Sequence, residues 1–385
     1  MGNKINKEYQ STCPLIDQRK TILEKNIPTI IIGLGVLNYK DKDFILLLLF
    51  RGNIEVYNSE NLELVSKSNN EMKYDCNGYI GNLTNEYFVV IGESSLRLYA
   101  LYEDNTDYNL KLVQKIDNQI KINENSIYTQ FYKAFILDRN LYKEYDIYEM
   151  EKNRKEKNIL SNESELIINS TKGIFVYKKD EDENNDNSNK FDFYDKYEKW
   201  KKNPYECKEQ ITCQYNYDII QVNFKYIAGT IHNFLCLYSM ETYELVTKFD
   251  IKTSDECDCI MFMLNEDILC IGGDDSITLI SIKNFEIVLV SLIKTKFKIT
   301  EICILPDFNI LIGMQNNDDS DSIKEYFYQY KYSYIMNTTT KKMEHKIIQG
   351  TSKLLTKNHS NIMMRCLNNN RIVIAVEYKK LQILE

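Results

Sequence analysis

The residues best suited to acid–base or nucleophilic chemistry are few. The chain of 385 residues has three histidines, His232, His345 and His359, which we expect in a turn, a strand and a loop. A catalytic serine or cysteine needs a histidine beside it in space, although the members of such a site need not be neighbours in sequence. The sequence contains no Gly-x-Ser-x-Gly turn, no glycine-rich phosphate loop and no histidine-rich metal pattern. We therefore expect no catalytic residue and no cofactor, and predict that the protein is not an enzyme.

Two segments carry residues that could bind a metal ion. Cys257 and Cys259 are two positions apart, so both thiols would point to one face of a strand. A structural zinc site needs two further ligands, and the neighbouring sequence supplies none at the usual spacing. The acidic run at 180–189 lacks the glycine and the terminal glutamate of an EF-hand loop. We predict no metal site, two strand cysteines, and a solvated acidic loop inserted at 180–190.

The N-terminus offers a possible lipidation site. Gly2 follows Met1 as in a myristoylation signal, but Asn6 stands where Ser or Thr is preferred. A single acyl chain would give only marginal membrane binding. The start of the chain has no signal-peptide core, and the longest apolar run, Phe44 to Phe50, is too short to cross a bilayer. We expect a cytoplasmic protein, with the nucleus as the alternative and with membrane association possible but weak.

The only tryptophan of the chain lies in a basic segment. Lys199, Trp200, Lys201 and Lys202 combine positive charge with an aromatic ring. Such a group can contact a protein partner or an anionic lipid headgroup. We take these four residues as a possible partner contact.

Composition excludes some classes of function. The formal net charge of −8 argues against binding to nucleic acid, which requires a basic surface. Hydrophobic residues make up 43% of the chain and aromatic residues 12%, enough for a large core. The ten cysteines are scattered, and several lie in apolar strand-like segments, where a free thiol behaves as a small hydrophobic group. We therefore expect free thiols in a reducing compartment.

The elements that would position these residues are short strands that recur at a regular interval. Each unit has a buried-looking strand, a tight turn, and a strand that ends in an aromatic or aliphatic anchor. The anchors are Tyr57, Tyr99, Ile147, Tyr194, Tyr238, Ile280, Tyr330 and Ile383, and they lie 42 to 53 residues apart. This period is typical of an all-β fold, the β-propeller of four-stranded antiparallel blades. We predict eight blades, with seven as the alternative.

The least regular units are the third and the fourth. We expect strands at Ala134 to Leu137 and Tyr142 to Tyr148 in the third unit. The fourth unit pairs Leu166 to Asn169 with Ile174 to Tyr177. An error in the predicted number of blades would arise in these two units.

The two ends of the chain complement each other. The last unit has three strands, and the segment Leu15 to Leu23 has no place in the first unit. An N-terminal strand that completes the last blade would remove an open sheet edge. We therefore predict a propeller closed by an N-terminal strand, with residues 1–14 as a flexible N-terminus and 15–385 as a single domain.

One strand carries an unusual number of tyrosines. Tyr326, Tyr328, Tyr330, Tyr332 and Tyr334 alternate with other residues and would share one face. Aromatic residues on strands usually serve packing, which is the interpretation we prefer. If the strand extends beyond its blade, exposed tyrosines would instead form a partner-binding patch.

The segment Tyr226 to Phe249 resembles a WD repeat. Ala228-Gly229 and Ile231 to Asn233 correspond to the first turn of such a repeat. Leu235 to Ser239 corresponds to the strand that ends in Trp-Asp, and Glu241 to Glu244 to the next turn. The Trp-Asp pair itself is replaced, and no Gly-His dipeptide occurs. The resemblance is therefore to a divergent WD-like propeller.

This resemblance implies a non-catalytic scaffold or adaptor that binds other proteins. One alternative is an enzyme or small-ligand-binding propeller that uses its central channel, although a segment such as Ile268 to Ile271 is aliphatic. Another is a membrane-peripheral propeller that binds phosphoinositides. Arg51-Gly52 is similar to the basic turn of lipid-binding propellers, which carry two consecutive arginines where this chain has one.

Overall fold

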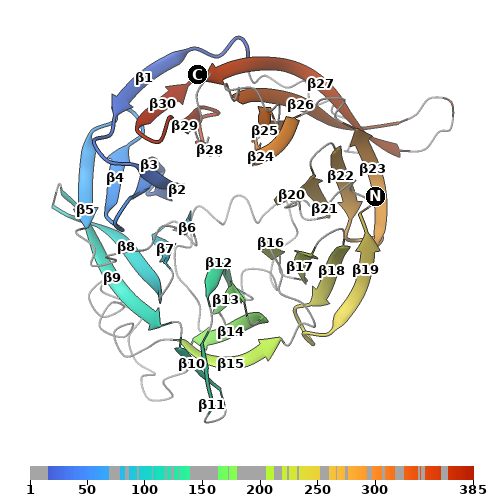
Figure 1. Ribbon diagram of the computed structural model, residues 1–385, viewed down its shortest axis with the longest axis horizontal. Helices are drawn as coiled ribbons and strands as arrows, with labels where there is room; N and C mark the ends of the chain where they lie inside the picture. The colour runs from blue at the N-terminus through green and yellow to red at the C-terminus, as the bar shows by residue number, and fades with distance from the viewer. Residues whose placement is uncertain are drawn as a thin grey trace, which may run out of the picture. The chain divides into compact units, whose positions relative to one another are not determined.

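The fold is an all-β propeller whose four-stranded antiparallel sheets are its blades (Figure 1). The computed structural model describes residues 16–68, 79–82, 86–92, 95–105, 107–117, 119–122, 125–128, 130–138, 164–171, 173–179, 205–211, 219–222, 225–231, 234–251, 260–265, 267–273, 276–292, 297–305, 308–316, 325–336, 339, 343–356 and 363–385. Within these ranges the strands form seven four-stranded sheets and one two-stranded hairpin. The chain divides into two units, residues 27–252 and residues 1–26 with 253–385.

The first of these units contains four blades. Blade 1 comprises β2 (Ile31–Tyr39), β3 (Lys42–Leu49), β4 (Ile54–Asn58) and β5 (Leu64–Ser68). Blade 2 comprises β6 (Tyr79–Asn82), β7 (Tyr87–Ile91), β8 (Ser95–Asp104) and β9 (Asp107–Asp117). Blade 3 comprises β12 (Phe131–Asp138), β13 (Ser164–Ser170), β14 (Gly173–Lys179) and β15 (Tyr205–Ile211). Blade 4 comprises β16 (Ile219–Val222), β17 (Tyr226–Ile231), β18 (Phe234–Ser239) and β19 (Leu245–Asp250), and the hairpin is β10 (Gln119–Ile122) with β11 (Asn125–Tyr128).

The second unit contains three blades. Blade 5 comprises β20 (Ile260–Asn265), β21 (Ile268–Gly272), β22 (Ser276–Ser281) and β23 (Glu286–Leu292). Blade 6 comprises β24 (Phe297–Ile304), β25 (Ile310–Asn316), β26 (Glu325–Met336) and β27 (Met343–Thr356). Blade 7 comprises β28 (Met363–Cys366), β29 (Ile372–Val376), β30 (Lys380–Leu384) and, from the other end of the chain, β1 (Thr21–Asn26).

The fourth strand of blade 7 comes from the N-terminus. β1 pairs antiparallel with β30, from Thr21 opposite Leu384 to Asn26 opposite Lys380. The Lys20 and Glu385 backbones exchange two further hydrogen bonds of 3.0 Å. The strand begins later than the predicted segment Leu15 to Leu23. That this strand closes the propeller as a whole stays a prediction.

The core lies between neighbouring blades of each unit. The second and third strands of a blade are buried on both faces, so they read as nearly continuous apolar runs. In β3, for example, Leu46 and Leu47 point to opposite faces and are both fully buried. Burying one such leucine stabilises the fold by about 2 kcal/mol. The outer strands alternate between half-buried and exposed residues, as in β19.

The outer strand of most blades bends at the anchor position. In blade 1, Val56 pairs with Ser66 but Tyr57 pairs with Leu64, which leaves Val65 as an extra residue in β5. Such a bulge bends a strand and increases its twist. The same shift occurs at Leu98/Tyr99, Val176/Tyr177, Leu237/Tyr238 and Leu279/Ile280. The repeated anchor therefore marks the place where the outer strand turns away from a regular ladder.

The residue after the anchor caps the turn into the outer strand. In blade 1, the Glu60 backbone N–H donates to the Asn58 side-chain oxygen over 2.8 Å. In blades 4 and 5 the hydroxyls of Ser239 and Ser281 accept equivalent bonds from the backbones of Glu241 and Asn284, each over 3.1 Å. A polar side chain at this position satisfies backbone donors that the turn leaves without a ladder partner.

The same three turns place a bulky residue in the left-handed region. Leu62, Tyr243 and Phe285 have φ of 55°, 57° and 55°. Glycine adopts this conformation without strain, but the chain has only 13 glycines and uses other residues here. We also predict turn positions with positive φ among Asn368 to Asn370, and Asn370, with φ of 64°, confirms this.

The prediction of eight blades is wrong, and the third and fourth predicted units explain the error. β12, from the predicted third unit, pairs with β13, from the predicted fourth unit, within one sheet. β14 then pairs with β15 in the same blade. The anchors Ile147 and Tyr194 lie outside the described residues. The entropic cost of closing a loop grows only slowly with its length. Two strands that are far apart in the sequence can therefore pair within one blade, so the even spacing of the anchors did not require a separate blade for each anchor.

Candidate functional site

The strand pair β26–β27 continues beyond the other strands of its blade (Figure 1). The last pair between β25 and β26 is Ile310 with Tyr330. β26 and β27 stay paired past this point, from Lys331 opposite Ile348 to Met336 opposite Met343. We call residues 331–336 and 343–348 the free ribbon. The free ribbon contains Tyr332 and Tyr334, the last two tyrosines of the tyrosine-rich stretch.

One face of the free ribbon is aromatic. Tyr332 lies opposite Ile347, and Tyr334 lies opposite His345, so these four side chains share a face. The Tyr332 hydroxyl and His345 Nδ1 are 3.0 Å apart. The rings of Tyr334 and His345 are tilted, with centroids 4.6 Å apart. The imidazole is thus held between two tyrosines.

Burial controls the protonation of this group. It lowers the pKa of His345, although the negative charge of Glu286 opposes the shift. It also raises the pKa of Tyr332 to about 12, so the phenol stays protonated at neutral pH. The Tyr332 hydroxyl can donate to an unprotonated Nδ1 or accept from an Nδ1–H, so the contact forms with either state of the ring. Burial favours the neutral form of His345.

The opposite face of the free ribbon carries two lysines, and Glu344 lies further along the same face, opposite Ile335. Lys331 pairs with Ile348, and Ser333 pairs with Lys346. Both lysines are exposed, and Ile348 is 55% exposed. In the part of the chain that the structure describes, neither lysine forms an ion pair. Lys331 lies across from Ile348, and Lys346 lies two positions along β27, between Ile348 and Glu344 on this face.

The tyrosine stretch thus divides between core and surface. Tyr330 is buried, and Tyr328 and Tyr332 pack against the same hydrophobic cluster, which confirms the predicted core packing for this half. Tyr334 is 49% exposed, because it lies beyond the reach of β25. The side chain of Tyr326 lies outside the described set. The alternative of an exposed tyrosine patch therefore applies only to the end of the strand.

A second extended strand pair shows how such a ribbon can be covered. In blade 2, β8 and β9 also continue past β7, to Asp104 opposite Asp107. There the Tyr108 ring lies 4.8 Å from that of Phe44, and the Lys40 ammonium lies 2.8 Å from the Glu103 carboxylate. These contacts attach that ribbon to the β2–β3 turn. Tyr334 and Ile348 of the free ribbon remain exposed instead.

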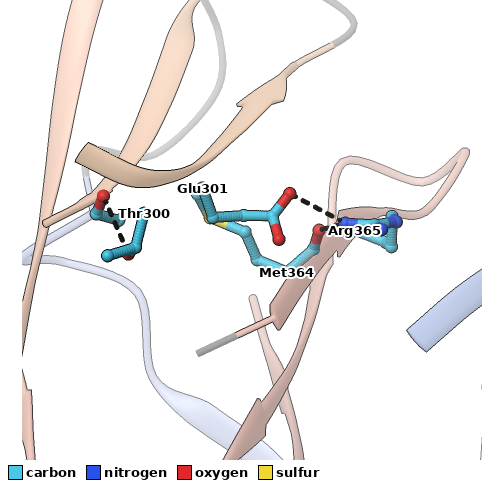
Figure 2. Close-up of polar contacts among 5 residues, drawn as sticks. Thr300, Glu301, Met364 and Arg365 are labelled. Atoms are coloured by element: carbon cyan, nitrogen blue, oxygen red, sulfur yellow. Dashed lines mark hydrogen bonds and ion pairs between the residues drawn. The ribbon is translucent and has the colours of Figure 1, made fainter. Parts of the chain in front are cut away.

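Blades 6 and 7 are linked by one ion pair at the opposite sheet edge from the ribbon. Figure 2 shows Glu301 of β24 directed at Arg365 of β28, with Nη1 3.1 Å from Oε1. The same nitrogen donates to the Met364 carbonyl over 2.6 Å. Burial raises the pKa of the neighbouring Cys303 thiol to about 12, so it is protonated and a poor nucleophile. The Glu301–Arg365 ion pair is therefore suited to a structural role, in which it holds β24 and β28 together.

Several predicted site residues lie outside the described ranges. They are Gly2, Lys199, Trp200, Lys201, Lys202, His232, Cys257, Cys259, His359, the acidic loop at 180–190 and the N-terminal residues 1–14. Their roles stay predictions. Arg51 and Gly52 are described: they form the β3–β4 turn, where the Gly52 N–H donates to the Leu49 carbonyl over 2.8 Å. His345 lies in an outer strand, as predicted.

The described ranges contain no candidate metal site and no candidate membrane-spanning helix. No group of three or more His, Cys, Asp or Glu side chains is placed to hold a metal ion there. No helix in those ranges has both the length and the apolar character needed to cross a bilayer.

The comparisons with known proteins assign no family. No protein-family model matches the sequence, and no curated protein matches it either. The β-propeller fold therefore comes from the strand pairing alone.

Proposed function

We propose that this protein is a non-catalytic, WD-repeat-like propeller that serves as a protein-interaction scaffold. The observation that carries the proposal is the free ribbon, on which Tyr334 and Ile348 are exposed by 49% and 55%. Exposed tyrosine on a rigid element binds partners well, because it adds large contact area at a low entropic cost. The propeller fold supports a scaffold role by analogy with WD-repeat propellers. The free ribbon would be the surface that contacts the partner protein.

Two further observations support parts of this proposal. The turn caps Asn58, Ser239 and Ser281 stand where WD repeats carry the Asp of Trp-Asp, and they hold the turn with a side-chain oxygen. Cys236, Cys270, Cys303 and Cys366 are free thiols. Free thiols are typical of a reducing compartment, which supports a cytoplasmic or nuclear location. The net charge of −8 supports a protein rather than a nucleic-acid partner.

The test compares three forms of the full chain. The first is wild type, and the second is the double variant Tyr334→Ser/Ile348→Ser. The third is a matched control, Leu245→Ser, because Leu245 is an aliphatic residue of an outer strand with 52% exposure. Each form is used to isolate bound proteins, and any stoichiometric protein is then purified and titrated against all three by calorimetry.

We expect a partner that binds wild type and the Leu245→Ser control equally. Its affinity for the double variant should fall by at least about tenfold, as for the loss of one interface hot spot. Recovery of no stoichiometric protein, or equal affinity for all three forms, would contradict the proposal.

A further inference from the structure

The free ribbon has an open backbone edge along β26. An interior strand of a blade normally has a hydrogen-bonded neighbour on each side. In the described part of the chain, residues 331–336 have β27 on one side and no strand on the other, because β25 ends opposite Tyr330. Such an edge can accept a further strand.

The side chains along this edge alternate in character. On one face, the edge presents Tyr332 and Tyr334. On the other face, it presents Lys331 and Ser333, with Lys346 next to Ser333 on β27. Residues 331–336 include no acidic side chain. A strand added here would place its own alternate residues beside these two rows.

We propose that this edge binds an extended protein segment in which apolar and acidic residues alternate, by addition as a fifth strand of blade 6. The apolar residues would pack beside Tyr332 and Tyr334, and the acidic residues would lie beside Lys331, with Lys346 one strand further away on β27. The proposal rests on the proposed function and names the chemistry of the partner. The lysines explain the choice of an acidic occupant, since both are exposed and without ion pairs among the described residues.

A second copy of the chain fits the same edge less well. Pairing of two β26 edges would bring Lys331 of each copy into one small interface, where like charges repel. A lysine on an edge strand is a common device against such self-association. The outer edge of β27 is also less suitable for an acidic segment, because β27 carries Glu344.

The probe is a synthetic eight-residue peptide that alternates Glu and Val, blocked at both ends and labelled with fluorescein. Its binding to the full chain is measured by fluorescence anisotropy. One comparison peptide alternates Lys and Val. Two others are N-methylated at every second amide, one in each phase, because strand addition uses only alternate amides of the added strand.

We expect the Glu–Val peptide to bind and the Lys–Val peptide to bind much more weakly. One N-methylated phase should lose binding and the other should retain it. The variant Lys331→Glu should weaken Glu–Val binding by about tenfold, through loss of an attractive pair and gain of a repulsive one. The control Lys67→Glu changes an exposed lysine on the outer strand β5 and should have no effect. Circular dichroism verifies that both variants fold.

No detectable Glu–Val binding up to about 1 mM peptide would overturn the inference. It would also be overturned if both N-methylated phases bind like the parent peptide, or if Lys331→Glu has no effect. These outcomes differ from failure of the proposed function. If a protein partner binds in a Tyr334-dependent way but the Glu–Val peptide does not bind, the strand-addition inference is rejected and the scaffold function is retained.

Discussion

Tyr334 and His345 face each other across the free ribbon, with ring centroids 4.6 Å apart, at a point that β25 does not reach. The pair packs an exposed tyrosine against a half-buried imidazole that also contacts Tyr332. This arrangement stiffens the ribbon without covering it. A rigid, uncovered aromatic group loses less conformational entropy on binding than a mobile one.

Acidification should weaken the ribbon through His345. Its pKa is lowered in the folded state, so the unfolded chain binds the proton more readily. The contribution is therefore complete above the ordinary histidine pKa of about 6.5 and is lost as the pH falls below it. We expect the melting temperature of wild type to fall more between pH 7.5 and 5 than that of His345→Gln.

A direct measurement complements this comparison. The chain has three histidines, so the imidazole proton resonances are few, and His345→Gln identifies the one from His345. This resonance should titrate below the ordinary histidine pKa of about 6.5. An ordinary midpoint for it, or equal melting behaviour of the two proteins, would show that His345 is not buried in solution as it is in the structure.

Asp41→Gly should stabilise the protein. Lys40 and Asp41 form the two-residue turn between Tyr39 and Lys42, with φ of 49° and 61°. Glycine is preferred at the second position of such a turn, and the substitution should add about 0.5 kcal/mol by removing strain. Lys40 is left unchanged because it pairs with Glu103. The midpoint of urea unfolding measures the effect, and a lower midpoint for the variant would contradict it.

Ser239→Ala should destabilise blade 4. The Ser239 hydroxyl accepts bonds from the Glu241 and Thr242 backbones at 3.1 and 3.3 Å. Their loss should cost about 1 kcal/mol. Ser239→Asn should retain most of the stability, because Asn58 performs the same role in blade 1. The midpoints of urea unfolding of wild type, Ser239→Ala and Ser239→Asn test this order of stability. Equal midpoints would contradict a capping role for Ser239.

The Glu301–Arg365 pair should contribute a small coupling energy. The two side chains are 16% and 33% exposed, so solvent screens their attraction. We expect a double-mutant cycle with Glu301→Gln and Arg365→Gln to give about 0.5–1 kcal/mol. The single variants should cost more than this, because both residues have further contacts. A coupling energy near zero would show that the pair does not link the two blades.

The local sequence was sufficient for most of the strands, but not for the β10–β11 hairpin or for the bounds of β1. Apolar runs such as Ile268–Gly272 appear as buried strands, and six of the eight predicted anchors lie in a third strand of a blade. These features depend on side-chain alternation and on turn residues, which act over a few positions. The same alternation also placed Tyr328, Tyr330, Tyr332 and Tyr334 on one face. The exposed positions of Lys331 and Lys346 on the ribbon were not predicted, because isolated lysines carry no signal in a lysine-rich chain.

The sequence by itself determined most of the segments that form strands and which residues share a face. Only the tertiary structure decided the number of blades, because β12 and β13 are distant in sequence and pair through backbone hydrogen bonds that leave no side-chain signature. It also decided that Tyr330 is buried while Tyr334 is exposed. Alternation gives both residues the same face, but burial depends on how far the neighbouring strand β25 extends, and β25 ends opposite Tyr330.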